Sequence, residues 1–307
     1  MGSQLDTTYG ALLIGVLFAT FFQGILSLQA YVYHVNYPDD IWQLKTLVAV
    51  VWSLDAAHLV LIAQACYHYL VRSFGETSKL VISTPELDLH LIFVGLATLA
   101  CQGFFLHRIW VCSRRNHILT CLLSAGCLVV FVLDVIISAQ IITHDSVSYF
   151  TVLRSEVIAV FSIGAGVDLA IAIVLVLYLQ QGKTDFHRTN SVLVRVVYFT
   201  VATGLATSIL AIGCLVAYLV APNTFIFIAM HFSLGRLYTN ALLATLNSRQ
   251  SLRLTPYTHP SAPSIAIMTT RVVTSTVDAG EYPMTSRSMK DSDLPGSPTV
   301  RVLPMVS

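Results

Sequence analysis

Several ionisable side chains of this sequence lie inside long apolar segments, where burying them is costly. Asp55 and His58 are three residues apart, so they project from one face of a helix. Arg236 and Asn240 are four residues apart on another such segment, and Asp168 lies near the middle of a third. An ionisable residue within a membrane-spanning helix costs roughly 2.5–3.5 kcal/mol on insertion scales. Each of these residues is therefore expected to have a partner or a function.

Two interpretations of these residues stay open at the level of sequence. Asp55 and His58 are either a carboxylate–imidazole pair that lines a polar cavity or a hydrogen-bonding pair that only fixes helix packing. Arg236 is either a ligand counter-ion or switchable lock, or it forms a static ion pair, with Asp55 as the preferred partner and Asp168 as the second choice. The candidates for a ligand or gating site, with His231 extending the polar face of its helix, are Asp55, His58, Asp168, His231, Arg236 and Asn240.

Catalysis and metal binding receive little support from the motifs. Asp55, His58 and His231 could meet and bind zinc, which makes an intramembrane metal hydrolase a remote alternative. No phosphate-binding glycine loop, nucleophile elbow or Cys-x-x-Cys pair occurs in the sequence. We therefore expect no catalytic residue, no metal and no cofactor.

The composition shows which elements must position these residues. Of the 307 residues, 55% are hydrophobic and 11% are charged, whereas about 25% are charged in a soluble domain. The net charge of +1 argues against a nucleic-acid partner. Crossing a bilayer takes about 20 apolar residues. Seven segments are long enough, namely 9–33, 44–70, 88–112, 117–142, 153–179, 191–220 and 224–246. The predicted fold is an all-α bundle of seven transmembrane helices over residues 9–246, with the lipid bilayer as its surroundings.

The orientation of this bundle follows from the basic residues near the helix ends. One side holds Lys45, Arg108, Arg114, Arg115, Lys183, Arg188, Arg195, Arg249 and Arg253. The opposite side holds only Arg72, Lys79 and Arg154. This bias predicts that the short N-terminus, residues 1–8, is extracytosolic and that the C-terminal tail, residues 247–307, is cytosolic. The tail has 10 Ser, 8 Thr and 7 Pro, so we expect it to be disordered and open to a cytosolic partner.

Several short segments resemble one family of membrane proteins. The segments are 54–58, 101–110, 188–191, 203–208 and 237–249. They are similar to uncharacterised multi-pass membrane proteins abundant in mushroom-forming fungi (basidiomycetes), which share a domain of unknown function that would cover roughly residues 168–253 here. The resemblance implies a seven-helix membrane protein, sometimes described as receptor-like on helix count alone.

The sequence as a whole favours a receptor-like or sensory membrane protein with a polar intramembrane site for a small ligand. A small-solute transporter or channel is the alternative. The absence of proline from the apolar segments disfavours the broken helices that many transporters use. The absence of a lysine deep in any segment excludes a retinal pigment. A polar path open to both faces would favour transport, and a cavity closed at the cytosolic end would favour sensing.

Overall fold

The computed structural model describes residues 6–74, 82–144, 149, 152–181 and 187–249. It is all-helical over these residues. Seven long helices form the bundle, with a short π-helical segment before the first (Asp6–Gly10) and another after the second (His68–Arg72). The helices are α2 (Ala11–Asn36), α3 (Trp42–Tyr67), α4 (Pro85–Cys112), α5 (His117–His144), α6 (Arg154–Gln181), α7 (His187–Val220) and α8 (Ile226–Asn247). The seven predicted segments are thus confirmed as helices. The predicted disordered tail and the first five residues lie outside the described residues, apart from residues 247–249.

Helix α4 begins three residues before the predicted apolar segment 88–112. Pro85 is the first residue of the helix, where its missing N–H costs nothing. Thr84 precedes it as the N-cap, and its side chain accepts a hydrogen bond from the backbone N–H of Leu87 at 3.3 Å. Glu86 and Asp88 in the first turn complement the positive end of the helix dipole.

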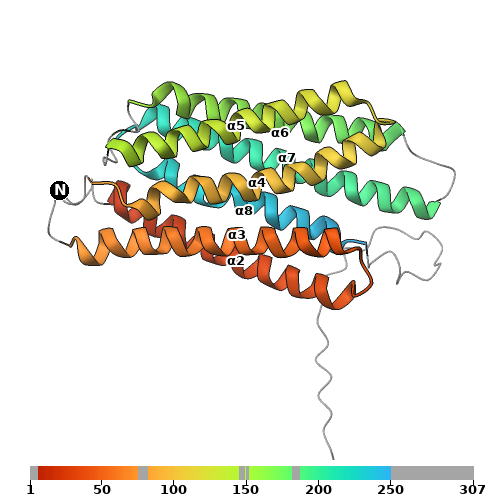
Figure 1. The fold of residues 1–307 in the computed structure, drawn as a ribbon, viewed down its shortest axis with the longest axis horizontal. Helices are drawn as coiled ribbons and strands as arrows, with labels where there is room; N and C mark the ends of the chain where they lie inside the picture. The colour runs from red at the N-terminus through yellow and green to blue at the C-terminus, as the bar shows by residue number, and fades with distance from the viewer. Residues whose placement is uncertain (1–5, 75–81, 145–148, 150–151, 182–186, 250–307) are drawn as a thin grey trace, which may run out of the picture. The chain divides into compact units, whose positions relative to one another are not determined.

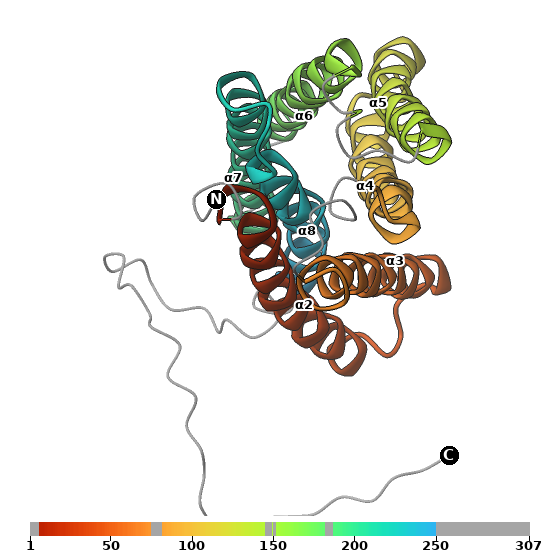
Figure 2. The ribbon, with the colours of Figure 1, turned by 90° about the vertical axis from the view of Figure 1, so that its left-hand side faces the viewer.

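Consecutive helices run antiparallel and pack side by side from α2 to α8 (Figure 1). Seen end-on, α8 lies among its neighbours and contacts α2, α3, α4 and α7 (Figure 2). We call the end of the bundle where α8 stops, beside the start of α3, the tail-side end, and the opposite end the far end. Because α8 touches four other helices, its polar side chains can be buried by protein instead of by lipid.

Among the residues that the structure describes, five helices are long and apolar enough to cross a membrane: α2, α3, α4, α5 and α6. In α7 the described side chains begin near Gly204, and the stretch from there to Val220 is a shorter apolar helix. The 22 residues of α8 include His231, Arg236 and Asn240, which lower its apolar content. A helix shielded by four others does not need a lipid-compatible surface all round. Composition therefore supports a membrane protein, with five helices that qualify as spans by themselves.

Small residues bring some helices very close together. A Cβ built on Gly204 of α7 would lie 2.5 Å from the Cβ of Ala172 in α6. A Cβ on Gly15 of α2 would lie 2.8 Å from the Cα of Ala229 in α8. The lack of a side chain at these two glycines thus allows the helices to approach closely.

Candidate intramembrane ligand site

Arg236 is the centre of a polar cluster between α3 and α8. Its side chain is fully buried, with 0% of its surface exposed. Its Nη1 donates to the Nδ1 of His58 at 2.7 Å and to the backbone carbonyl of Phe232 at 2.8 Å. Its Nη2 donates to the backbone carbonyl of Asp55 at 3.3 Å. The structure thus brings together Asp55, His58 and Arg236, and Asp55 and His58 share one helix face as their spacing predicts.

The predicted ion pair between Arg236 and Asp55 is wrong in its detail. The guanidinium binds the backbone of Asp55, while the Oδ2 of that residue accepts a hydrogen bond from Thr239 at 2.5 Å. Among the residues that the structure describes, the salt bridge between Asp40 and Arg249 is the only one. The fork of the guanidinium is occupied by an imidazole and two carbonyls, so the cluster is held by hydrogen bonds around a buried charge.

Asp168, the second choice as partner, is also bound elsewhere. Its Oδ1 accepts a hydrogen bond from the Nε2 of Gln102 in α4 at 3.2 Å.

Asn240 does not point into this cluster either. Its Nδ2 donates to the carbonyls of Phe22 at 3.3 Å and Arg236 at 2.8 Å, so it joins α8 to α2. Asn240 is therefore placed as a packing residue.

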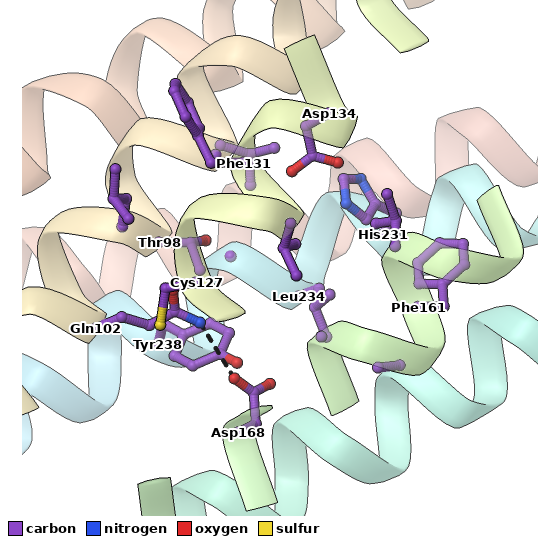
Figure 3. A pocket seen from close by; sticks show the side chains of 18 residues that line it. Thr98, Gln102, Cys127, Phe131, Asp134, Phe161, Asp168, His231, Leu234 and Tyr238 are labelled. Carbon is purple, nitrogen blue, oxygen red and sulfur yellow. Dashed lines mark hydrogen bonds between the residues drawn. The ribbon is translucent and has the colours of Figure 1, made fainter. Parts of the chain in front are cut away.

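A narrow cavity of about 50 Å³ lies between α4, α5, α6 and α8. Its polar lining consists of Thr98, Gln102, Asp134, Asp168, His231 and Tyr238 (Figure 3). The ring of His231 lies next to the carboxyl group of Asp134, and the Gln102–Asp168 hydrogen bond lies at the other side of the cavity (Figure 3). A site of this size has room for a few water molecules or one small polar ligand.

A second cavity, of about 30 Å³, opens on the other side of His231. His90, Asp134 and His231 form its polar part, and the rest of its lining is apolar, including Leu91 and Phe161. Asp134 and His231 line both cavities, so the two are neighbouring compartments around the same pair of residues.

Three histidines from three helices lie near one another at this depth. The ring centroids of His58 and His90 are 5.6 Å apart, and those of His90 and His231 are 6.1 Å apart. Within the described part of the chain, no three His, Cys, Asp or Glu side chains are placed to hold a metal ion. The predicted zinc set of Asp55, His58 and His231 is therefore not assembled.

Sequence reasoning missed His90, Gln102 and Thr239 as residues of this site. His90 lies five residues after the start of α4, which suggests an interfacial position, yet only 1% of its surface is exposed. Gln102 and Thr239 are uncharged, so the cost of burying a charge does not single them out in the sequence. The one available signal was that Thr239 lies three residues after Arg236 on the same helix face.

An apolar layer separates the polar cluster from the tail-side end. It belongs to a buried group that includes Leu26 of α2, Val51 of α3, and Leu242, Leu243 and Leu246 of α8. These α8 residues follow Asn240 along the helix, so they lie between the Arg236 cluster and the tail-side end. Thr245 lies among these α8 residues, but its buried hydroxyl has no hydrogen-bond partner among the described residues, so it does not link the Arg236 cluster to the tail-side end.

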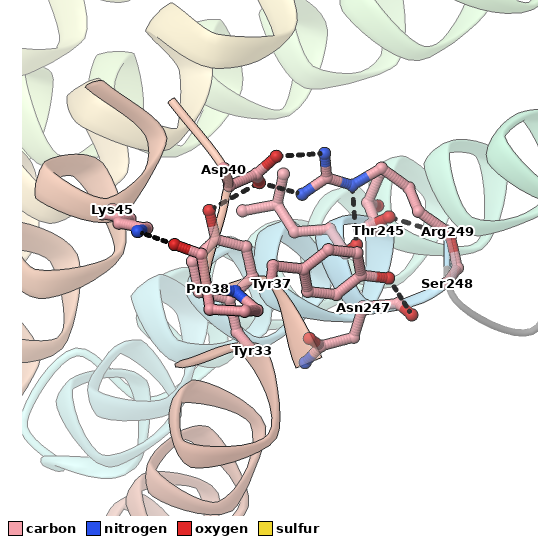
Figure 4. Close-up of polar contacts among 10 residues, drawn as sticks. Tyr33, Tyr37, Pro38, Asp40, Lys45, Thr245, Asn247, Ser248 and Arg249 are labelled. Carbon is pink, nitrogen blue, oxygen red and sulfur yellow. Dashed lines mark hydrogen bonds and ion pairs between the residues drawn. The ribbon is translucent and has the colours of Figure 1, made fainter. Parts of the chain in front are cut away.

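A second polar cluster, which we call the tail-side latch, lies beyond the apolar layer (Figure 4). Asp40, between α2 and α3, accepts hydrogen bonds from Arg249 at 2.6 and 3.3 Å and from the hydroxyl of Tyr33 at 2.8 Å. The guanidinium of Arg249 lies 4.6 Å from the ring centroid of Tyr37, whose hydroxyl donates to the carbonyl of Asn247. The latch therefore ties the α2–α3 loop to the end of α8.

The charges of the latch stabilise each other. The hydrogen bond from Arg249 is the largest influence on Asp40, and it lowers the pKa of that carboxyl group despite partial burial. Burial by itself lowers the pKa of Arg249, but the hydrogen bond and negative charge of Asp40 outweigh it and raise the pKa. Both side chains are partly exposed, at 34% for Arg249 and 19% for Asp40, so the pair is worth at most about 1 kcal/mol.

Comparison with known proteins adds a family match in the C-terminal part. A family model described as "Family of unknown function (DUF6534)" matches residues 164–251. The matched region contains Asp168, His231, Arg236 and Asn240, whereas Asp55 and His58 lie outside it. Comparisons with curated proteins and with solved structures find no match. The family and the apolar helices together fit an integral membrane protein.

Proposed function

We propose that this chain is a seven-span sensory membrane protein that binds a small polar ligand in the cavities around His231. The observation that carries the proposal is the polar site between helices that stops at an apolar layer before the tail-side end. His231 and Asp134 line both cavities, and Asp168 with Gln102 closes the larger one at one side. A small polar ligand in these cavities can form hydrogen bonds with these four side chains.

The seven-span arrangement and its orientation are part of this proposal. Placing α7 and α8 in the membrane beside the five apolar helices lets α8 bury its polar face against α2, α3, α4 and α7. The bias of basic residues places the N-terminus outside and the tail-side end in the cytosol. In this orientation the cavities lie on the extracytosolic side of the apolar layer.

Helix α8 offers a route by which binding can reach the tail. It carries His231 at the cavities and Arg236 in the polar cluster, and it ends at Asn247 in the tail-side latch. A shift or rotation of α8 on ligand binding would change the distance between Arg249 and Asp40. The latch includes the first residues of the proposed cytosolic tail, so its opening is a local change to which a cytosolic partner can respond.

Transport is the second candidate function. The observation that favours it is the cavity beside Asp168, because this residue lies halfway along α6. A transported solute must pass the apolar layer around Leu242 and Val51. Sensing requires no such passage. The two functions therefore differ in whether a ligand that binds is also carried across.

The test combines binding with flux on the same protein. Purified protein in lipid nanodiscs is screened by thermal shift against small polar compounds, and each hit is tested again on His231→Phe. His34→Phe is the matched control, because His34 is exposed on α2. We expect hits that stabilise the wild type and the control but not His231→Phe. Reconstituted vesicles should then show no protein-dependent uptake of the radiolabelled hit.

Two results would overturn the proposal. Saturable uptake of the hit into vesicles would establish transport. A stabilising effect that persists in His231→Phe would place the binding site elsewhere in the protein.

A further inference from the structure

The hydrogen bonds of His58 determine which of its ring nitrogens carries the proton. Its Nδ1 faces the Nη1 of Arg236 at 2.7 Å. A guanidinium has only donors, so the Nδ1 of His58 must be the acceptor and carry the lone pair. In neutral His58 the hydrogen is therefore on Nε2, and protonating Nδ1 would set two N–H groups against each other. His58 is fully buried, and its Nε2 has no hydrogen-bond partner among the described residues.

His90 has the opposite arrangement. Its Nδ1 contacts the backbone carbonyl of Leu87, which can only accept a hydrogen bond. The Nδ1 of His90 therefore carries the hydrogen, and its Nε2 carries the lone pair. This Nε2 is also buried without a partner in the described part of the protein. Neighbouring helices thus present one unused donor, on His58, and one unused acceptor, on His90.

The rings of His58 and His90 are close neighbours on α3 and α4. Their centroids are 5.6 Å apart and the ring planes are tilted by 39°. The two Nε2 atoms are not hydrogen-bonded to each other. Two hydrogen bonds in series, each about 2.8 Å between heavy atoms, let one atom join two nitrogens that lie up to about 5.6 Å apart. Both nitrogens are buried without a partner, and a group that bridges them removes the cost of leaving them unsatisfied.

We propose that the Nε2 atoms of His58 and His90 hold one neutral hydroxyl oxygen, which accepts from His58 and donates to His90. Charge excludes the other small occupants. A cation would face the N–H of His58 and the nearby guanidinium of Arg236. An anion would face the lone pair of His90. A group that both donates and accepts through one atom satisfies both rings.

The hydroxyl has two possible sources with the same chemistry. One is a bound water molecule. The other is the hydroxyl group of a small ligand whose apolar part lies in the second cavity, beside Leu91 and Phe161, where His90 supplies part of the lining. The ligand source rests on the proposed sensory function, and it narrows the ligand class to small neutral alcohols. The water source does not depend on that function.

The completed chain is polarised in one direction. Arg236 donates to His58, His58 to the hydroxyl, the hydroxyl to His90, and His90 to the carbonyl of Leu87. Neither end can pass on a proton, because arginine stays protonated in proteins and a carbonyl is not a base at neutral pH. The chain is therefore a fixed contact between α8, α3 and α4 and not a proton path.

The test reads the ring nitrogens of the wild-type protein directly. Full-length protein labelled with ¹⁵N-histidine in nanodiscs is measured by magnetic-resonance spectroscopy, and His58→Gln and His90→Phe assign the two rings. We expect His58 to be protonated only at Nε2 and His90 only at Nδ1. The Nε2–H of His58 should show a cross-peak to the bound hydroxyl, which His90→Phe abolishes and the control His34→Phe retains.

The source of the hydroxyl is distinguished with ¹³C-methanol as the probe. A cross-peak from water in the protein alone, unchanged by methanol, identifies water. A cross-peak to the labelled methyl group identifies the ligand source. The same tautomer on both rings, a cationic ring, or a His90 Nε2 without a hydrogen bond would overturn the inference. Transport activity in the vesicle assay would overturn the sensory function and leave the tautomers as stated.

Discussion

Two buried threonines on α8 allow the energy of the polar cluster to be measured. The hydroxyl of Thr239 donates to the Oδ2 of Asp55 at 2.5 Å, and the Oδ1 of that carboxyl group has no partner among the described residues. The hydroxyl of Thr245, six residues further along, is buried without a hydrogen bond to any described residue. Their side chains are 0% and 3% exposed. The same substitution at both positions therefore removes a used and an unused hydroxyl.

Thr239→Val is expected to destabilise the protein, and Thr245→Val is not. Valine has nearly the shape of threonine, so packing is kept while the donor is lost. Without that donor, both oxygens of the Asp55 carboxyl group are left buried and unpaired. Leaving a buried acceptor unsatisfied costs about 2 kcal/mol. Removing the unpaired hydroxyl of Thr245 relieves a desolvation cost, so that variant should be neutral or slightly more stable.

Thermal unfolding in nanodiscs measures the difference. For a domain of 150–250 residues, each 1 kcal/mol shifts the melting temperature by about 2–4 °C. Thr239→Val should therefore melt roughly 4–8 °C below the wild type, and Thr245→Val at or above it. Equal melting temperatures for the two variants would refute the reasoning, because they would show that the hydrogen bond to Asp55 contributes nothing.

Three further predictions concern the cluster, the helix packing and the latch. Arg236→Met should lower the free energy of unfolding by about 2–4 kcal/mol, because it leaves buried acceptors unpaired. Adding His58→Phe should recover part of that loss in equilibrium unfolding, whereas strictly additive losses would contradict the contact between Arg236 and His58. Gly204→Ala should destabilise by about 1–3 kcal/mol because its Cβ meets α6 at 2.5 Å, while Gly103→Ala, which meets nothing within 4 Å, should be neutral or stabilising in the same assay. Because the pKa of Asp40 is lowered in the folded protein, the latch stabilises the fold above about pH 4, and this stabilisation is lost as the pH falls through the lowered pKa. The difference in unfolding free energy between wild type and Asp40→Asn should therefore narrow between pH 7 and pH 3. A constant difference would argue against the charge pair of Asp40 and Arg249.

The sequence alone determined the helices and much of the polar site. Apolar segments of about 20 residues have few alternatives to a helix in a bilayer, because every backbone group must be satisfied within the segment. The three-residue spacing of Asp55 and His58 placed both on one helix face, and the structure shows that this face meets α8. Arg236 was recognised as too deep to stand without partners, and the structure gives it three hydrogen bonds. Periodicity is a property of one helix, so these results needed no knowledge of its neighbours.

Only the tertiary structure decided which groups meet. The rotation of one helix against another is set by packing contacts such as Gly204 against Ala172, and no pattern within one helix encodes it. Shifting the register of a helix by one residue turns its side chains by about 100° around the helix axis, which is enough to exchange one partner for another. Arg236 therefore binds the imidazole of His58 and the backbone of Asp55 instead of a carboxylate.

The same limit explains the residues that were missed or misplaced. His90 belongs to the site because the first turns of α4 pack against α8, where the ring centroids of His90 and Phe232 are 5.3 Å apart. The latch joins Asp40 to Arg249, residues separated by 209 positions in the chain. Hydrogen bonds at such separations depend on where the helices end in space. The sequence alone determined that buried polar groups need partners, and the packing of the helices decided which partners they have.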